Sequence, residues 1–172
     1  GLNLLNRKDN TFKRFKHEPA NPNSLSSNAI NEIWEDGKHN LWIGTANQGI
    51  SILSPDQLHF RNIRAEKGQG KLNNNNIRAF YQDQNRIVWI GTDGGGINFY
   101  DPRTETFTSA KNDPGDLGSI SSNVAFVIYK SRDNLLWVGG YLSGLNIHDE
   151  NKNKFQTFRK VGQDGKGLSN YT

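Results

Sequence analysis

The stretch VWIGTDGGGINFYD, residues 88–101, contains an apolar strand, a run of glycines and a second apolar strand. A glycine-rich turn after a strand can cradle a phosphate. However, a P-loop needs Lys and then Ser or Thr after its last glycine, and a dinucleotide-binding turn opens a helix. Ile97, Asn98, Phe99 and Tyr100 follow instead, with the alternation and the side-chain types of a strand. The stretch therefore predicts a β-hairpin and does not favour a nucleotide site.

Two other stretches repeat this pattern, LWIGTANQGISILS at 41–54 and LWVGGYLSGLNIHD at 136–149. The tryptophans of the three stretches are separated by 47 and then 48 residues along the chain, and the hairpin glycines keep the same spacing. A structural position needs the same residue type in every unit, so we interpret both sets as structural. Stacking of the tryptophans against a sugar is the alternative interpretation. The structural set is Trp42, Trp89, Trp137, Gly49, Gly96 and Gly144.

Each period holds four strand candidates, for example AINEIWED, LWIGT, GISIL and a strand that begins at Phe60. A unit of roughly 40–50 residues with four strands is the size of a propeller blade. The sequence therefore predicts an all-β fold, a partial β-propeller of four-stranded antiparallel blades, with about three complete blades plus partial ones. We expect the outer half of a blade at 1–15, blades at 29–63, 77–108 and 124–158, and a linker with the start of the next inner strand at 159–172.

Composition limits the other classes of protein. The 172 residues contain no cysteine, carry a formal net charge of +4 and include no apolar run long enough to span a bilayer. The basic residues lie after the glycine hairpins, and a nucleic-acid surface would need them interleaved with stacking aromatic residues on one face. We interpret them as a solvated rim and expect no nucleic acid partner. Because the chain does not begin with Met, we expect it to be a piece of a longer protein.

Catalytic and metal-binding patterns are not found in the sequence. Its four histidines show no metal-ligand spacing, and DENKN at 149–153 lacks the glycine and the final glutamate of a calcium loop. There is no Gly-x-Ser-x-Gly nucleophile turn. We therefore predict that this chain is not an enzyme and uses no metal and no cofactor.

The complete units LSSNAINEIWEDGKHNLWIGTANQGISILS, from Leu25, and LNNNNIRAFYQDQNRIVWIGTDGGGINFYD, from Leu72, resemble the two-component regulator propeller repeat. The linkers HEPANPNSLSSN and NDPGDLGSISSN match as well. The third unit departs from the pattern, with Ser131 for the usual Asp and Gly140 for Thr. We expect different hydrogen bonding there.

The resemblance implies a sensor. Such repeats typically form the extracytoplasmic part of hybrid histidine kinases in glycan-degrading bacteria, which sense oligosaccharides. It implies an oligosaccharide ligand, a histidine kinase elsewhere in the parent chain, and a periplasmic location as part of an inner-membrane sensor, with the membrane reached only through that parent. A non-catalytic interaction or coupling scaffold is the alternative, and a propeller-type glycosidase or lyase is less favoured.

Candidate ligand contacts are equivalent positions at which the residue type differs from unit to unit, because a ligand is contacted by different residues of each unit. In propeller geometry, the hairpins between second and third strands emerge on one face of the ring, together with the starts of the inner strands. Asn31, Arg78 and Phe126 are equivalent positions near those starts. The predicted ligand-binding residues are Asn31, Asn47, Gln48, Arg78, Asp93, Tyr141 and Ser143.

The ends of the chain suggest association. Three blades cannot close a ring, since single-ring propellers have roughly four to eight. The terminal blades would each expose a face that a neighbour normally covers. We therefore expect this chain to self-associate, with LNLLN and TFKRF at its N-terminal end against the C-terminal end of another copy. The alternative is a ring of four blades within one chain, whose last blade is only a stub.

Overall fold

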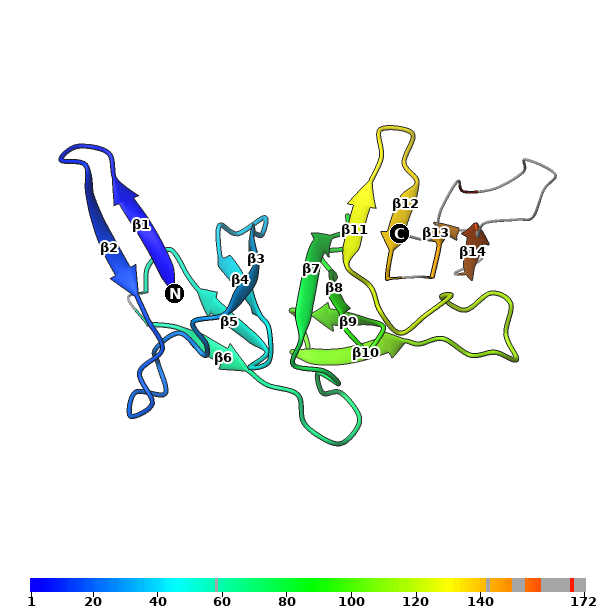
Figure 1. Cartoon of the computed structure of the whole chain (residues 1–172), viewed down its shortest axis with the longest axis horizontal. Helices are drawn as coiled ribbons and strands as arrows, with labels where there is room; N and C mark the ends of the chain where they lie inside the picture. The colour runs from blue at the N-terminus through cyan, green and yellow to red at the C-terminus, as the bar shows by residue number, and fades with distance from the viewer. Residues whose placement is uncertain (58, 142, 150–153, 159–167, 169–172) are drawn as a thin grey trace.

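The computed structural model describes residues 1–57, 59–141, 143–149, 154–158 and 168, and every element within them is a β-strand. The sheets follow one another along the chain as separate units (Figure 1). The first is the two-stranded sheet of β1 (Leu2–Asn6) and β2 (Thr11–Phe15). The next is β3 (Ile30–Glu35), β4 (Leu41–Thr45), β5 (Ile50–Leu53) and β6 (Arg61–Ile63).

Two further four-stranded sheets complete the described chain. One contains β7 (Ile77–Gln82), β8 (Val88–Thr92), β9 (Ile97–Asp101) and β10 (Thr106–Ala110). The other contains β11 (Val127–Lys130), β12 (Leu136–Gly139), β13 (Leu145–Asp149) and β14 (Lys154–Phe158). All neighbouring strands are antiparallel and consecutive in sequence. The predicted all-β fold of four-stranded antiparallel blades is confirmed.

The sheets lie side by side as blades do, with the first strand of each sheet next to that of its neighbour. β7 contacts β3 on one side and β11 on the other, and Figure 1 shows these strands near the middle of the array. We call the sheets β3–β6, β7–β10 and β11–β14 the first, second and third blades.

The blades coincide with the three repeats, with small shifts at their ends. They span 30–63, 77–110 and 127–158. The third blade differs most from the expected start at 124, because Val124 forms only an isolated bridge with Asp93 before the regular ladder begins at Val127. The linker and inner strand expected at 159–172 lie outside the described residues, apart from Leu168.

The hydrophobic core lies between blades instead of within one sheet. Trp42, from the first blade, packs with Phe80 and Tyr100 of the second, with ring centroids 5.8 and 5.6 Å apart. Trp89 makes the equivalent crossing from the second blade toward Ile128 and Val138 of the third. Strands with apolar residues on both faces are what a sheet covered on both sides requires.

Each of the repeated tryptophans is also anchored within its own blade. The Trp42 and Trp89 indoles donate hydrogen bonds from Nε1 to the carboxylates of Asp36 and Asp83, at 2.9 and 3.1 Å. Trp137 donates to the Ser131 hydroxyl at 3.1 Å. The serine thus keeps the contact with the indole but supplies a neutral acceptor in place of a charged one.

The aspartates additionally organise the turn that follows them. The Asp36 carboxylate accepts hydrogen bonds from the backbone N–H groups of Lys38 and Asn40, and Asp83 holds the equivalent turn. Ser131 instead donates to the carbonyl oxygen of Leu135. Burial of the Asp36 carboxylate acts to raise its pKa, but the hydrogen bonds from Asn40, Trp42 and Lys38 outweigh this, so the pKa lies below its usual value.

Candidate functional site

The hairpins between second and third strands are fixed by a glycine and a threonine. Gly49 and Gly96 have φ of 74° and 72°, and a Cβ at these positions would lie 2.1 and 2.2 Å from a carbonyl oxygen of the fourth strand. Thr45 and Thr92 each donate from Oγ1 to the carbonyl of that glycine at 2.8 Å. The two hairpins therefore project their central residues from a rigid base.

The linker to the next blade closes the same hairpins. The N–H groups of Gly49 and Gly96 donate to the carbonyl oxygens of Asn75 and Asn123, at 2.9 and 2.8 Å. The side-chain oxygens of these asparagines accept from Ala65 and Asn112 in their own linkers. The last residue of the Leu-x-x-Asn motif thus holds the hairpin of one blade against the entry to the next.

At this end of the strands, polar side chains of the first two blades form a connected network. Arg78 contacts Asp93 with 2.9 Å between Nη2 and Oδ2, and both side chains are about one-third exposed. Asn76 donates to the same Asp93 oxygen at 3.3 Å. Asn31 donates to the Asn76 side chain at 3.2 Å and to the Ile77 carbonyl at 2.9 Å.

Aromatic rings of the third blade extend this network. The Arg78 guanidinium carbon lies 4.6 Å from the centre of the Phe126 ring, and the Phe126 and Tyr141 rings are 6.4 Å apart with 35° between their planes. The Tyr141 side chain is 62% exposed, so one ring is available to a partner. We call this row the hairpin-end surface; it comprises Asn31, Asn76, Arg78, Asp93, Phe126 and Tyr141.

The structure therefore brings together four of the seven predicted ligand contacts, namely Asn31, Arg78, Asp93 and Tyr141. Asn47 and Gln48 lie in the β4–β5 hairpin at the same end of the strands. Asn47 is exposed, while Gln48 is half-buried with its N–H bonded to Thr45 Oγ1.

Ser143 is placed differently from the other predicted contacts. Its side chain is buried, and its Oγ would lie 2.6 Å from a Cβ on Gly140, which stands where the other units have Thr45 and Thr92. Ser143 therefore occupies the space left by the missing threonine and does not reach the hairpin-end surface.

Two members of the surface were not among the predicted contacts. The sequence identifies Phe126 only as the equivalent of Asn31 and Arg78. In the structure its ring lies between Arg78 and Tyr141 and contacts both. Asn76 is equivalent to Ala29 and Val124 and joins two blades. The same test of broken symmetry, applied one residue after the motif asparagine, would have found it.

The surface has the chemistry of recognition. Asp93 accepts from Arg78, while the guanidinium has further N–H donors and its side chain is one-third exposed. Within the described parts of the chain, no group of His, Asp and Glu side chains could hold a metal ion. No helix among those residues is long and apolar enough to cross a membrane. Amide, guanidinium, carboxylate and phenol groups beside a ring suit a ligand that is rich in hydroxyl groups.

The fold and the repeat together define the class of protein, a β-propeller described here as three adjacent blades and an additional two-stranded sheet. Residues 71–94, which include Arg78 and Asp93, match the family model described as the two component regulator propeller. The chain therefore carries a repeat of that family, as its sequence predicted. No curated protein matches it in sequence.

Solved structures agree with this fold. The extracellular domain of BT4673 from B. thetaiotaomicron, described as a one component and as a hybrid two component system, is similar over 99% of this chain and 21% of its own, with 22% identity and a TM-score of 0.74. The extracellular domain of the hybrid two component system BT3049 from the same organism is 27% identical over 100% of this chain and 27% of its own, with a TM-score of 0.50. YCF48 bound to D1 peptide is 13% identical over 86% of this chain and 43% of its own, with a TM-score of 0.57.

The chain thus spans only about a fifth to a quarter of the length of the two-component extracellular domains that it resembles. What it shares with them is the propeller fold.

Proposed function

We propose that this chain is part of a periplasmic sensor propeller that binds an oligosaccharide and signals to a histidine kinase elsewhere in the parent protein, anchored in the inner membrane. The observation that carries the proposal is the hairpin-end surface. Its six residues come from three blades, differ from unit to unit, and still form one connected row.

The geometry suggests how the ligand is held. The half-buried Phe126 and the exposed Tyr141 offer ring faces for the apolar side of a sugar. Arg78 offers N–H donors for its hydroxyl oxygens, and Asn31, whose two N–H groups donate to Asn76 and Ile77, offers its side-chain oxygen as an acceptor. Asp93 orients Arg78, so part of the ordering cost is met before binding. A ligand that contacts several blades would be sensitive to the angles between them, which is a route by which occupancy could reach the parent chain.

Isothermal titration calorimetry of this chain with a panel of neutral oligosaccharides tests the proposal. Removal of the ring in Phe126→Ala takes away contacts worth roughly 0.5–1.5 kcal/mol, and we expect a loss in affinity of about two- to tenfold. Tyr129→Ala is the control, because Tyr129 is an aromatic residue of the third blade that lies farther along β11 and is 57% exposed. Equal binding by both variants would remove the hairpin-end surface from the site.

The interaction scaffold is the second candidate. YCF48, which shares the fold, was solved with a peptide bound. If no oligosaccharide gives heat and a protein or peptide binds instead, with Phe126→Ala weakening that binding, the surface serves a scaffold.

A further inference from the structure

A second candidate site lies at the opposite end of the strands, between the first and second blades. A cavity of about 260 Å³ opens where the β3–β4 turn of one blade faces the β7–β8 and β9–β10 turns of the other. Trp42 and Tyr100, both nearly buried, form part of its wall. The hairpin-end surface lies at the far ends of the same strands, so the two sites are separate.

Four cationic side chains line this cavity, and they come from four different turns or strands: Lys38, Arg61, Arg86 and Arg103. Two carboxylates, those of Asp36 and Glu105, also line it, which leaves an excess of positive charge. The Asp36 oxygens already accept hydrogen bonds from its own turn and from Trp42, so they are occupied.

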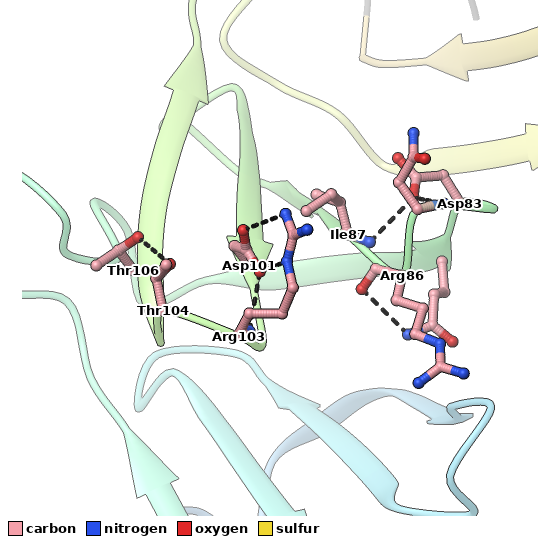
Figure 2. A network of polar contacts seen from close by, with 9 residues as sticks. Asp83, Arg86, Ile87, Asp101, Arg103, Thr104 and Thr106 are labelled. Atoms are coloured by element: carbon pink, nitrogen blue, oxygen red, sulfur yellow. Dashed lines mark hydrogen bonds and ion pairs between the residues drawn. The ribbon is translucent and has the colours of Figure 1, made fainter.

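The cations differ in how far they are already paired. Arg61 contacts Glu105 at 3.3 Å and donates to the Tyr100 hydroxyl at 3.2 Å, and Arg103 donates to Asp101 through Nε and Nη2. In Figure 2, Arg103 lies folded back on Asp101. Lys38 and Arg86 are exposed, and neither has an ion-pair partner among the described residues.

A glutamine links the two turns that carry the unpaired cations. Gln82 accepts from the N–H of Gly37, next to Lys38, at 3.0 Å, and donates to the Arg86 carbonyl at 3.3 Å (Figure 2 shows this contact at Arg86). The turns that carry Lys38 and Arg86 are therefore linked to each other through one side chain.

At the next gap between blades, three of these four positions are neutral. By strand register and turn position, Lys38, Arg61 and Arg86 correspond there to Asn85, Thr108 and Asn134, all of them neutral. If a blade junction needed cations for packing, both gaps would have them. Cations at these three positions in one junction, and neutral residues at the same described positions in the other, indicate a requirement other than packing.

We propose that this cavity, which we call the basic cavity, binds the oxyanion group of a small ligand, a carboxylate or a sulfate. Arginine and lysine are the usual donors to both groups, and Arg86 and Lys38 have unused N–H donors. The volume lies below the roughly 300–1,000 Å³ of sites that enclose drug-sized ligands, so the cavity suits one anionic group with at most a single sugar ring. This site is independent of the oligosaccharide proposed at the hairpin-end surface.

The test uses this chain labelled with ¹⁵N and follows the indole N–H signal of Trp42, whose side chain lines the cavity. The probes are sodium sulfate, sodium glucuronate and neutral methyl glucoside at a constant ionic strength set with sodium chloride, because salt alone screens exposed charges. We expect a saturable shift with sulfate or glucuronate and none with the glucoside. Saturation by glucuronate alone would assign a carboxylate, and saturation by sulfate alone a sulfate ester.

Charge variants locate the binding. Arg86→Gln removes an unpaired cation and should weaken binding about tenfold, since a charge-assisted hydrogen bond contributes on that order. Arg132→Gln is the matched control, because it removes the same charge from an exposed turn position of the third blade. Lys38→Gln provides a second variant if Arg86→Gln lowers the melting temperature.

The proposal is overturned if no anion gives saturation, if methyl glucoside shifts the signal equally, or if Arg132→Gln weakens binding as much as Arg86→Gln. Phe126→Ala should leave anion binding unchanged, and Arg86→Gln should leave the binding of neutral oligosaccharides unchanged. The two sites can therefore fail separately.

Discussion

Replacement of Trp89 by alanine should remove a large part of the stability of this chain without acting on a ligand directly. The Trp89 side chain is 7% exposed, and its ring lies 4.6 Å from Phe99 and 5.0 Å from His148, between centroids. Truncation of a buried aromatic residue costs about 3–5 kcal/mol, because packing is lost and a cavity remains. The indole also gives up its hydrogen bond to Asp83, and bonds to charged acceptors contribute roughly 1.5–3 kcal/mol.

The two contributions overlap, so we expect a total of about 4–6 kcal/mol, against a domain stability of roughly 5–15 kcal/mol. Urea unfolding followed by far-UV circular dichroism would show this as a lower midpoint. Trp89→Phe separates the two contributions, since it keeps most of the ring and loses only the bond to Asp83.

The third blade offers the internal control for that bond. Trp137 donates to the neutral hydroxyl of Ser131, so Trp137→Phe should cost less than Trp89→Phe. An unchanged unfolding midpoint for Trp89→Ala, combined with lost oligosaccharide binding, would refute the structural role and return Trp89 to the ligand site. Equal costs for the two Trp→Phe variants would show that the charge on the acceptor is irrelevant.

Three further outcomes follow from the fold. Gly96→Ala should cost about 2 kcal/mol or more, because φ is 72° and the new Cβ would lie 2.2 Å from the Ala110 carbonyl oxygen of β10. A Cβ at Gly139 meets nothing nearer than 3.9 Å, so Gly139→Ala is the control in thermal melts. Asp36 has a lowered pKa, so its contribution is complete above the unfolded pKa of about 4 and is lost as the pH falls through the folded value. In Asp36→Asn, the melting temperature should therefore fall less steeply as the pH is lowered below about 4. The same fall as in the unaltered chain would contradict this. Light scattering should show self-association through the exposed β1–β2 sheet, where Leu4 and Phe12 are 58% and 60% exposed; a monomer at micromolar concentration, or no effect of Phe12→Lys, would count against it.

The sequence predicted the regular parts of the molecule because they repeat. Each unit needs one glycine in a left-handed turn and one tryptophan between blades, and their recurrence in three units makes both recognisable in the sequence. The same reasoning in reverse found Arg78 and Asp93, which stand at symmetry-breaking positions and pair in the structure.

Contacts that depend on three dimensions were not predictable. Ser143 stands at a symmetry-breaking position, but its side chain fills the space beside Gly140. That this space is free, because a glycine replaces the threonine of the other units, is visible only in the folded hairpin. The basic cavity was missed for a related reason. The cations that line it, Lys38, Arg61, Arg86 and Arg103, form no motif along the chain. The sequence interpretation places Arg61 in a solvated rim and does not single out the other three.

The contact of Gly49 and Gly96 with asparagines of the following linker has a consequence for the order of folding. A blade can pair its four strands from its own residues, but the N–H of its hairpin glycine has no partner until the ribosome has delivered the asparagine of the next repeat. Each blade would then be completed one repeat late during translation, and its proteolytic resistance should rise only when the following asparagine has left the exit tunnel. Arrays with nearest-neighbour coupling of this kind fold as a progression along the chain, in which each unit supplies the last contact of the one before it.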